Sequence, residues 1–264
     1  MEIILYNDGI ADEIDIAGIA GYLSQTLGQV KVEIKEKPLF YGLSPGQVQD
    51  YATRVAGIKV LDAMRPMEPD TKPLYGEVEY EKRRILGKTR SFGILYDGFH
   101  LLRIYYDLIA DEVRHRDCIP ILFTNRVFAT WDNGDRRYHI RTSLYGMPSV
   151  VSTTGIIEAP ARPREYYLLK QQCESLGRDP LALKETFRGR FIDYDDKRLT
   201  GVARGYALQA VFYALTGDPF CQDKGCRLYN AHWQEELIHA QIESEYEFCP
   251  RHAALLKRLQ ASAS

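Results

Sequence analysis

The chain has 264 residues, of which 45% are hydrophobic and 27% charged, and it carries a formal net charge of −2. This length and apolar content are enough for a real core. The near-neutral charge and a pI near 6.3 argue against a nucleic-acid partner, because phosphate neutralisation needs a basic face. No uncharged run approaches the roughly 20 residues that span a bilayer, and the acidic N-terminal sequence lacks a signal-peptide pattern. We therefore expect no membrane partner.

The first part of the chain alternates predicted strands and helices. Hydrophobic periodicity predicts strands over residues 2–6, 30–35 and 91–96, and helices over residues 14–27, 45–64 and 101–115. The first of these helices should end at Gly28. Residues 65–73 contain three prolines and are predicted to form a loop.

The middle of the chain predicts further strands over residues 119–129, 139–145 and 149–158. The turn-forming residues 131–135 should join the first two of these as a hairpin. A helix over residues 163–176 follows, with Pro163 at its first turn. Both β-α-β and hairpin connections are expected, so the fold class is α+β (mixed α/β): a mixed, twisted sheet packed by helices.

Residues 199–217 are predicted to form one apolar helix. Thr200 is a candidate N-cap, Gly217 can adopt the left-handed conformation after the last turn, and Pro219 prevents continuation. Between residues 206 and 215, Gln209 is the only strongly polar residue. A helix that is apolar nearly all round is a central buried helix.

A second helix is predicted over residues 231–244, with Asn230 as its N-cap. One face of this helix would carry possible metal ligands, namely His232, Glu235, Glu236 and His239. Such a face is more often solvated, and we prefer that interpretation. Asp97 and His100, at the end of the strand predicted over residues 91–96, are a second candidate pair, for acid–base chemistry. Asp97-Gly98 is equally explained as a turn.

The most specific pattern in the chain is formed by Cys221, Cys226, Cys249 and His252. They read C-x4-C, 22 further residues, and then C-x2-H. Two short-range pairs of soft ligands predict a closed tetrahedral site for one zinc ion, which leaves no position for water and holds structure. The alternative is a set of thiols that never meet.

The charge of this site and the total number of cysteines lead to two further expectations. Three thiolates around Zn²⁺ leave a charge of −1, which Lys224, Arg227 and Arg251 could offset. The odd number of cysteines, five in all, suits a reducing compartment, so a cytoplasmic location is expected.

Residues 200–257 resemble the archaemetzincins, a family of metzincin-type zinc metallopeptidases. The signature of this family is H-E-x-x-H-x-x-G-x-x-H-C-x4-C-x-M, followed some twenty residues later by C-x2-C. Aligned on Cys221, the chain reads A-V-F-Y-A-L-T-G-D-P-F-C-Q-D-K-G-C-R-L. The glycine corresponds to Gly217 and the methionine to Leu228, and Cys249 and His252 correspond to the distal pair.

The same resemblance places other residues where the family has its catalytic groups. The three zinc-binding histidines fall on Ala210, Ala214 and Phe220, and the general-base glutamate falls on Val211. Metzincin hydrolysis requires those imidazoles and a carboxylate that deprotonates the metal-bound water. No H-E-x-x-H occurs anywhere in the chain. If the alignment holds, Ala210, Ala214 and Phe220 should converge on one point in space.

The resemblance therefore implies a single metzincin-like domain over residues 1–264. Its sheet-and-helix portion would span residues 1–198, and a central helix with a small structural zinc subdomain would span residues 199–260. The expected function is that of a catalytically inactive zinc protein that binds a peptide or protein in the remnant cleft. The alternative is a metal-dependent hydrolase with a non-standard site. About one zinc ion per chain favours the former, and two or more favour the latter.

Overall fold

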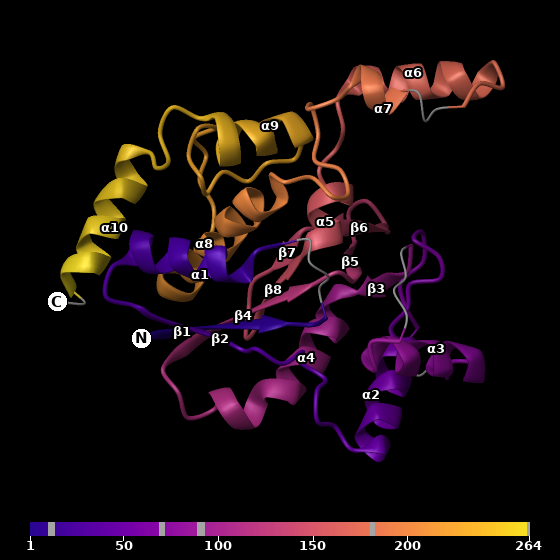
Figure 1. The fold of residues 1–264 in the computed structure, drawn as a ribbon. Coiled ribbons are helices and arrows are strands. Elements are labelled where there is room, and N and C mark those ends of the chain that lie inside the picture. The colour runs from indigo at the N-terminus through magenta and orange to yellow at the C-terminus, as the bar shows by residue number, and fades with distance from the viewer. Residues whose placement is uncertain (10–13, 69–71, 89–92, 180–182, 263–264) are drawn as a thin grey trace.

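The computed structural model describes residues 1–9, 14–68, 72–88, 93–179 and 183–262, and it arranges them as sheets between layers of helices (Figure 1). The larger sheet has the strand order β2-β1-β4-β8-β7. Its strands are β2 (Lys31–Ile34), β1 (Glu2–Asn7), β4 (Cys118–Thr124), β8 (Ser149–Ser152) and β7 (Ser143–Leu144). Neighbouring strands run parallel except for β7, which is antiparallel to β8 and forms one edge.

A smaller sheet has the order β3-β5-β6. Its strands are β3 (Leu95–Asp97), β5 (Val127–Asp132) and β6 (Arg137–Arg141). The strand β3 is parallel to β5, whereas β5 and β6 form an antiparallel hairpin in which Trp131 is paired with Tyr138. The molecule therefore combines parallel and antiparallel pairing, and its fold class is mixed α/β, as the sequence predicts.

Helices cover both faces of the larger sheet (Figure 1). On one side lie α1 (Ile16–Leu27), α8 (Leu199–Thr216), α9 (Gln234–Ile238) and α10 (Pro250–Ser262). On the other lie α2 (Pro45–Gly57), α3 (Tyr75–Ile85) and α4 (Gly98–Val113). The short α5 (Thr153–Glu158) follows β8, and the π-helix η2 (His239–Glu243) continues α9. Among the described residues, no helix is both long enough and apolar enough to cross a membrane.

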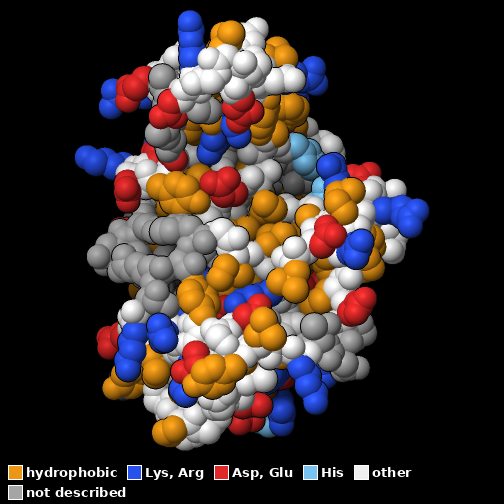
Figure 2. Space-filling view, turned by 90° about the vertical axis from the view of Figure 1, so that its right-hand side faces the viewer, with side chains coloured by type: hydrophobic (Ala, Val, Ile, Leu, Met, Phe, Trp, Pro, Cys, Tyr) orange, Lys and Arg blue, Asp and Glu red, His pale blue; other side chains and the backbone are white. Residues whose placement is uncertain are grey.

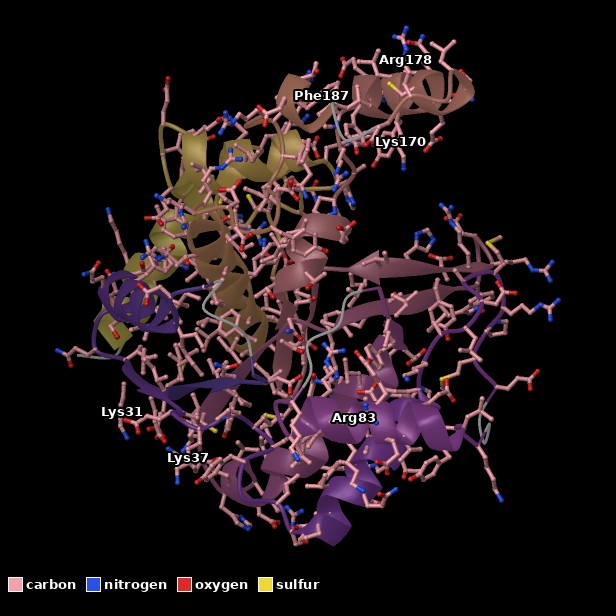
Figure 3. All side chains as sticks on the ribbon, turned by 45° about the vertical axis from the view of Figure 1, so that its right-hand side comes forward. Lys31, Lys37, Arg83, Lys170, Arg178 and Phe187 are labelled. Atoms are coloured by element: carbon pink, nitrogen blue, oxygen red, sulfur yellow. The ribbon has the colours of Figure 1, made fainter. Side chains whose placement is uncertain are left out.

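Two further helices, α6 (Arg164–Ser175) and α7 (Leu183–Thr186), project away from the sheet at the upper right of Figure 1. Figure 3 labels Lys170, Arg178 and Phe187 on this projection. Figure 2 shows hydrophobic side chains gathered on the face below it. Inside the projection, Tyr166, Phe187 and Phe191 form part of a small separate core.

The alternation of side chains along β1 explains the two main cores. Ile3 and Leu5 point to the core that contains α1 and α8, whereas Ile4 and Tyr6 point to the core that contains α4. Successive residues of a strand face opposite sides, so a strand with helices on both sides is apolar at every position. This is why the strand β4 is buried along its whole length.

The helix α8 lies in the first of these cores, as expected for an apolar helix. Two glycines on it allow η2 to approach closely, and we call this contact the glycine seam. A Cβ atom at Gly205 would lie 1.8 Å from Oε1 of Gln241, and one at Gly201 would lie 2.9 Å from Cδ1 of Ile242. The Gln241 side chain in turn donates from Nε2 to the carbonyl oxygen of Arg227 at 2.8 Å.

Several predicted elements differ from the structure. The predicted strand over residues 119–129 is two strands, β4 and β5, because Asn125 and Arg126 carry the chain from one sheet to the other. The predicted strand over residues 149–158 is β8 followed by α5, since the Ser152 hydroxyl accepts from the Gly155 N–H at 2.8 Å and caps a helix there. The helix α2 ends at Gly57 rather than at residue 64. Part of the strand predicted over residues 91–96 lies outside the described residues.

Three capping and boundary predictions near the C-terminus are also wrong. Thr200 lies inside α8, where its hydroxyl accepts from the N–H of Asp15 at 3.0 Å, and Arg198 is at the N-cap position. The helix predicted over residues 231–244 begins at Gln234, after Trp233 rather than after Asn230, and changes to π-helix at His239. The helices α3, α7 and α10 have no counterpart among the predicted elements.

Candidate metal centre

The first two predicted zinc ligands lie in the loop that follows α8. Gly217 ends this helix in the left-handed conformation, with φ 74°. The chain then folds back on itself: the N–H of Cys221 donates to the carbonyl oxygen of Leu228 at 2.9 Å, and the N–H of Cys226 donates to that of Asp223 at 3.1 Å. These bonds fix both cysteines on one side of a tight loop.

The second pair comes from the start of α10. Cys249 directly precedes this helix, and its carbonyl oxygen accepts from the N–H of Ala253 at 2.9 Å. His252 lies in the first turn, so its ring faces the same side as the Cys249 thiol. Helical geometry thus explains why the C-x2-H spacing brings these two ligands together.

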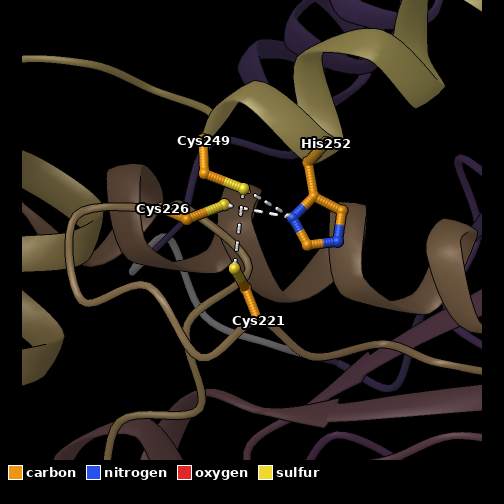
Figure 4. A group of neighbouring side chains, drawn as sticks. All are labelled: Cys221, Cys226, Cys249 and His252. Atoms are coloured by element: carbon orange, nitrogen blue, oxygen red, sulfur yellow. Dashed lines mark hydrogen bonds between the residues drawn. The ribbon is translucent and has the colours of Figure 1, made fainter.

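All four side chains are buried, and their ligand atoms lie within 4.8 Å of one another (Figure 4). The Cys221 and Cys249 sulfurs are 3.7 Å apart, and Nδ1 of His252 lies 3.2 Å from Cys249 Sγ and 3.5 Å from Cys226 Sγ. A tetrahedron with Zn–S bonds of about 2.3 Å has edges of about 3.8 Å, close to the observed sulfur separation. The cysteines are free thiols. The cluster therefore fits one zinc ion.

Burial controls the protonation of these groups. It raises the pKa of the Cys226 thiol to about 12 and also raises the pKa of the Cys221 thiol. Burial, together with the nearby positive charge of Arg251, lowers the pKa of His252, which keeps its imidazole neutral. Zinc is bound by thiolates and neutral imidazole, so binding would release thiol protons and strengthen as the pH rises.

The three basic residues that were predicted to offset the charge of the cluster each have other partners as well. Lys224 pairs with Glu236 at 3.6 Å, Arg251 pairs with Asp218 at 3.6 Å, and Arg227 donates to backbone carbonyl oxygens. The sulfur of Cys221 instead accepts from the N–H of Asp223 at 3.3 Å.

The four positions aligned with metzincin catalytic groups do not share one environment. Ala210 and Val211 are fully buried in the core, Ala214 is exposed, and Phe220 is half-buried. Of these four, Phe220 alone lines the cavity beside α8, which has a volume of about 490 Å³. The face of α8 toward this cavity carries Tyr206, Gln209 and Tyr213 instead. We call this cavity the α8 cavity.

A hydrogen-bond network holds one wall of the α8 cavity. The Tyr145 hydroxyl donates to Oε1 of Gln209 at 2.5 Å and accepts from the Ser143 hydroxyl at 2.9 Å. The Tyr145 ring lies 5.8 Å, centroid to centroid, from the rings of both Tyr213 and Phe220. Sequence analysis did not assign these residues to a site, although the isolated polarity of Gln209 within an apolar helix was a signal.

The two other candidate sites have different outcomes. Asp97 and His100 do meet, with Oδ1 of Asp97 2.8 Å from Nδ1 of His100. The same carboxylate caps α4 and accepts from the Tyr138 hydroxyl at 3.0 Å, so it has a structural function. His232 and His239 belong to no group of three or more potential metal ligands among the described residues.

Comparison with known proteins gives a match along nearly the whole chain. The model of the "Probable metallopeptidase family (DUF6775)" matches residues 1–259. A zinc-dependent peptidase from Methanocorpusculum labreanum (strain Z), known from its crystal structure, is 14% identical over 96% of this chain and 99% of that chain, with a TM-score of 0.42. A likeness of that degree supports no conclusion about this chain. No curated protein matches.

Proposed function

The chain belongs to the "Probable metallopeptidase family (DUF6775)". We propose that it is an archaemetzincin-like member of this family that has no peptidase activity. In this proposal a structural zinc ion at Cys221, Cys226, Cys249 and His252 stabilises the C-terminal part. A peptide or protein segment binds in the α8 cavity.

The observation that carries the proposal is the composition of the cavity wall. The described residues that line the α8 cavity include no Asp, Glu or Cys, and His232 is the only histidine among them. A metzincin centre needs three imidazoles around zinc and a carboxylate as general base. This wall offers neither. The Cys3His cluster could not substitute, since four protein ligands leave no place for water.

Tyrosines do not supply the missing base. Burial raises the pKa of Tyr206 to about 12 and also raises that of Tyr145, so both hydroxyls remain protonated at neutral pH. A protonated hydroxyl can donate a hydrogen bond to a peptide carbonyl but does not deprotonate water. The chemistry of the wall therefore favours binding over hydrolysis.

The position of the cavity favours an extended peptide as the ligand. Residues 140–145, which include the edge strand β7, line one side of it. An edge strand has unpaired backbone groups to which another strand can add, and neighbouring pockets then select side chains. The aromatic rings of Tyr145, Tyr213 and Phe220 would provide the apolar contacts. All five cysteines are unpaired, which supports a reducing, cytoplasmic location.

Metal analysis and a cleavage assay on the purified protein test the loss of activity. We expect about one zinc ion per chain. Incubation with unfolded casein should give no cleavage above background, with a peptidase that has an intact H-E-x-x-H as positive control. Two zinc ions per chain with chelator-sensitive cleavage would instead support the hydrolase alternative and direct attention to His232 and Glu236.

Peptide binding is tested by selecting from a random peptide library and measuring the selected peptides by calorimetry. Tyr213→Ala should weaken binding about tenfold, because aromatic anchors dominate such interfaces. Tyr75→Ala is the matched control, since Tyr75 is 80% exposed on α3. Equal binding by Tyr213→Ala and the unaltered protein would exclude the α8 cavity as the site.

A further inference from the structure

A second cavity, of about 410 Å³, lies at the carboxyl ends of the central strands of the larger sheet. Asp8 and Gly9 follow β1, Asn125 follows β4, and all three line this cavity. Arg84, near the end of α3, and Phe40 and Val48 contribute to the other walls. We call it the switch-point cavity.

The topology of the sheet accounts for a crevice at this place. From β1 the chain passes through α1 to β2 on one side, whereas β4 lies on the other side of β1 and the chain continues from it toward β8. Where the connections that follow two neighbouring parallel strands run to opposite sides of the sheet, they separate and leave a crevice outside the carboxyl ends of those strands. Ligands of open α/β sheets bind in such crevices.

One carboxylate oxygen of Asp8 accepts several hydrogen bonds, whereas the other accepts none from the described residues. Its Oδ2 atom accepts from the Tyr105 hydroxyl at 2.5 Å, from the Thr124 hydroxyl at 2.8 Å and from Nη1 of Arg126 at 2.6 Å. The side chain is only 1% exposed, yet Oδ1 has no hydrogen-bond partner among the described residues. An unmade bond to a buried carboxylate oxygen is costly, so a donor on a ligand would be strongly favoured.

The charges behind the cavity wall are unequal. Arg126 lies between the carboxylates of Asp8 and Glu81, and Lys59 pairs with Glu81 at 3.5 Å. Together with Arg84, this gives three cations to two carboxylates within the described part of the chain. Among these described groups, the cations therefore outnumber the carboxylates by one.

Arg84 is the cation that reaches the cavity. Its Nη1 and Nη2 atoms donate to the Tyr96 hydroxyl at 3.1 Å and to Oδ1 of Asn125 at 2.7 Å, which are both neutral groups. In the part of the chain that the structure describes, Arg84 has no carboxylate partner. Because a guanidinium carries more N–H donors than these two bonds use, it is suited to bind a carboxylate at a cavity wall.

We propose that the switch-point cavity binds a small carboxylic acid that carries a hydrogen-bond donor and an apolar side chain, namely an α-amino or α-hydroxy acid. Its carboxylate binds Arg84 and its amine or hydroxyl donates to Oδ1 of Asp8. The apolar side chain packs against Phe40 and Val48. The volume is within the range of cavities that enclose small ligands.

This site is independent of the function proposed for the α8 cavity. The two cavities share no lining residue. If no peptide binds in the α8 cavity, the proposal for the switch-point cavity is unaffected. If no small acid binds in the switch-point cavity, the proposal for the α8 cavity is likewise unaffected.

A series of related compounds tests the proposal on the unaltered protein by calorimetry. L-leucine and 2-hydroxy-4-methylpentanoate carry both groups, 4-methylpentanoate lacks the donor, and 3-methylbutylamine lacks the carboxylate. At least one of the first two should bind, and each of the last two should bind about tenfold more weakly or not at all. The stronger of the first two identifies the amine or the hydroxyl as the donor. Absence of binding by both at about 10 mM, or equal binding of 4-methylpentanoate, would overturn the proposal.

Variants on one helix provide the matched comparison. Arg84→Gln should weaken binding of the stronger ligand about tenfold. Arg83→Gln is the control, because Arg83 is the neighbouring residue of α3, is exposed and does not line the cavity (Figure 3). Unchanged binding by a folded Arg84→Gln variant would contradict the assignment. The compound series does not depend on whether this variant folds.

Discussion

Two buried polar centres of this molecule are built in opposite ways. The Cys3His cluster takes its groups from one stretch, Cys221 to His252, and they face one another without any opposite charge between them. The centre around Arg126 takes its groups from distant parts of the chain, and Asp8 and Glu81 there already oppose a cation. The first centre therefore depends on an ion that the chain does not contain, whereas the second is stabilised by the chain itself. The two should respond to different perturbations.

The largest expected effect is at the Cys3His cluster. Cys249→Ser removes one zinc ligand, and because structural zinc binding is coupled to folding, we expect loss of zinc and of about 4 kcal/mol or more of stability. For a chain of this size that corresponds to a fall of about 10 °C in Tm. Metal analysis and calorimetry measure both quantities. Cys173→Ser, at a half-buried position on α6, is the control, and an unchanged Tm for Cys249→Ser would refute a structural zinc site.

A smaller effect is expected at the second centre. Arg126→Met leaves Asp8 and Glu81 buried without their shared cation, which should lower the free energy of unfolding by about 3 kcal/mol while the zinc content stays unchanged. Urea denaturation measures the loss. The control is Arg137→Met, because Arg137 forms an exposed ion pair with Asp135. This substitution should lower the free energy of unfolding by less than about 1 kcal/mol. Equal losses of unfolding free energy in the two variants would mean that burial does not determine how much these ion pairs contribute to stability.

The smallest effect concerns ion pairs that are half-buried at the surface. Hydrogen bonds from Lys35 and Arg116 lower the pKa of Glu33 to about 2 from its ordinary value of 4.5. A lowered pKa stabilises the folded state above pH 4.5, and this contribution disappears as the pH falls toward 2. Solvent screening limits it to under about 1 kcal/mol. In Glu33→Gln, the free energy of unfolding should therefore fall less steeply over this interval, and the difference should shrink in about 1 M salt.

The difference between the two centres also explains what the sequence could reveal. The ligand spacing C-x4-C and C-x2-H is local, so a loop and a helical turn suffice to bring each pair together, and the four residues meet as predicted. Nothing near Asp8 in the sequence points to Glu81 or Arg126. Their meeting depends on the pairing of β1 with β4 and on the position of α3.

Errors in the predicted elements have similar causes. Residues 119–129 read as one apolar strand, and only the sheet arrangement separates β4 from β5. The cavity beside α8 is lined by Tyr206, Gln209 and Tyr213, a different stripe of the helix from Ala210 and Ala214, because burial in the core determines how a helix is rotated. The helix α10 begins at Pro250, directly after Cys249, so the C-x2-H ligand pattern coincides with its first turn and conceals the helical pattern there.

The glycine seam has a consequence for the mutational tolerance of the chain. Gly205 contacts no metal ligand, yet even alanine there would displace Gln241 and break its bond to the Arg227 carbonyl. That bond connects η2 to the residue that follows Cys226, so its loss would loosen the loop that carries the first ligand pair. In a saturation library, position 205 should therefore be less tolerant than the exposed positions of α8, although more tolerant than the cysteines themselves. An inherited change on a helix that binds no ion could thus weaken the protein's capacity to retain one.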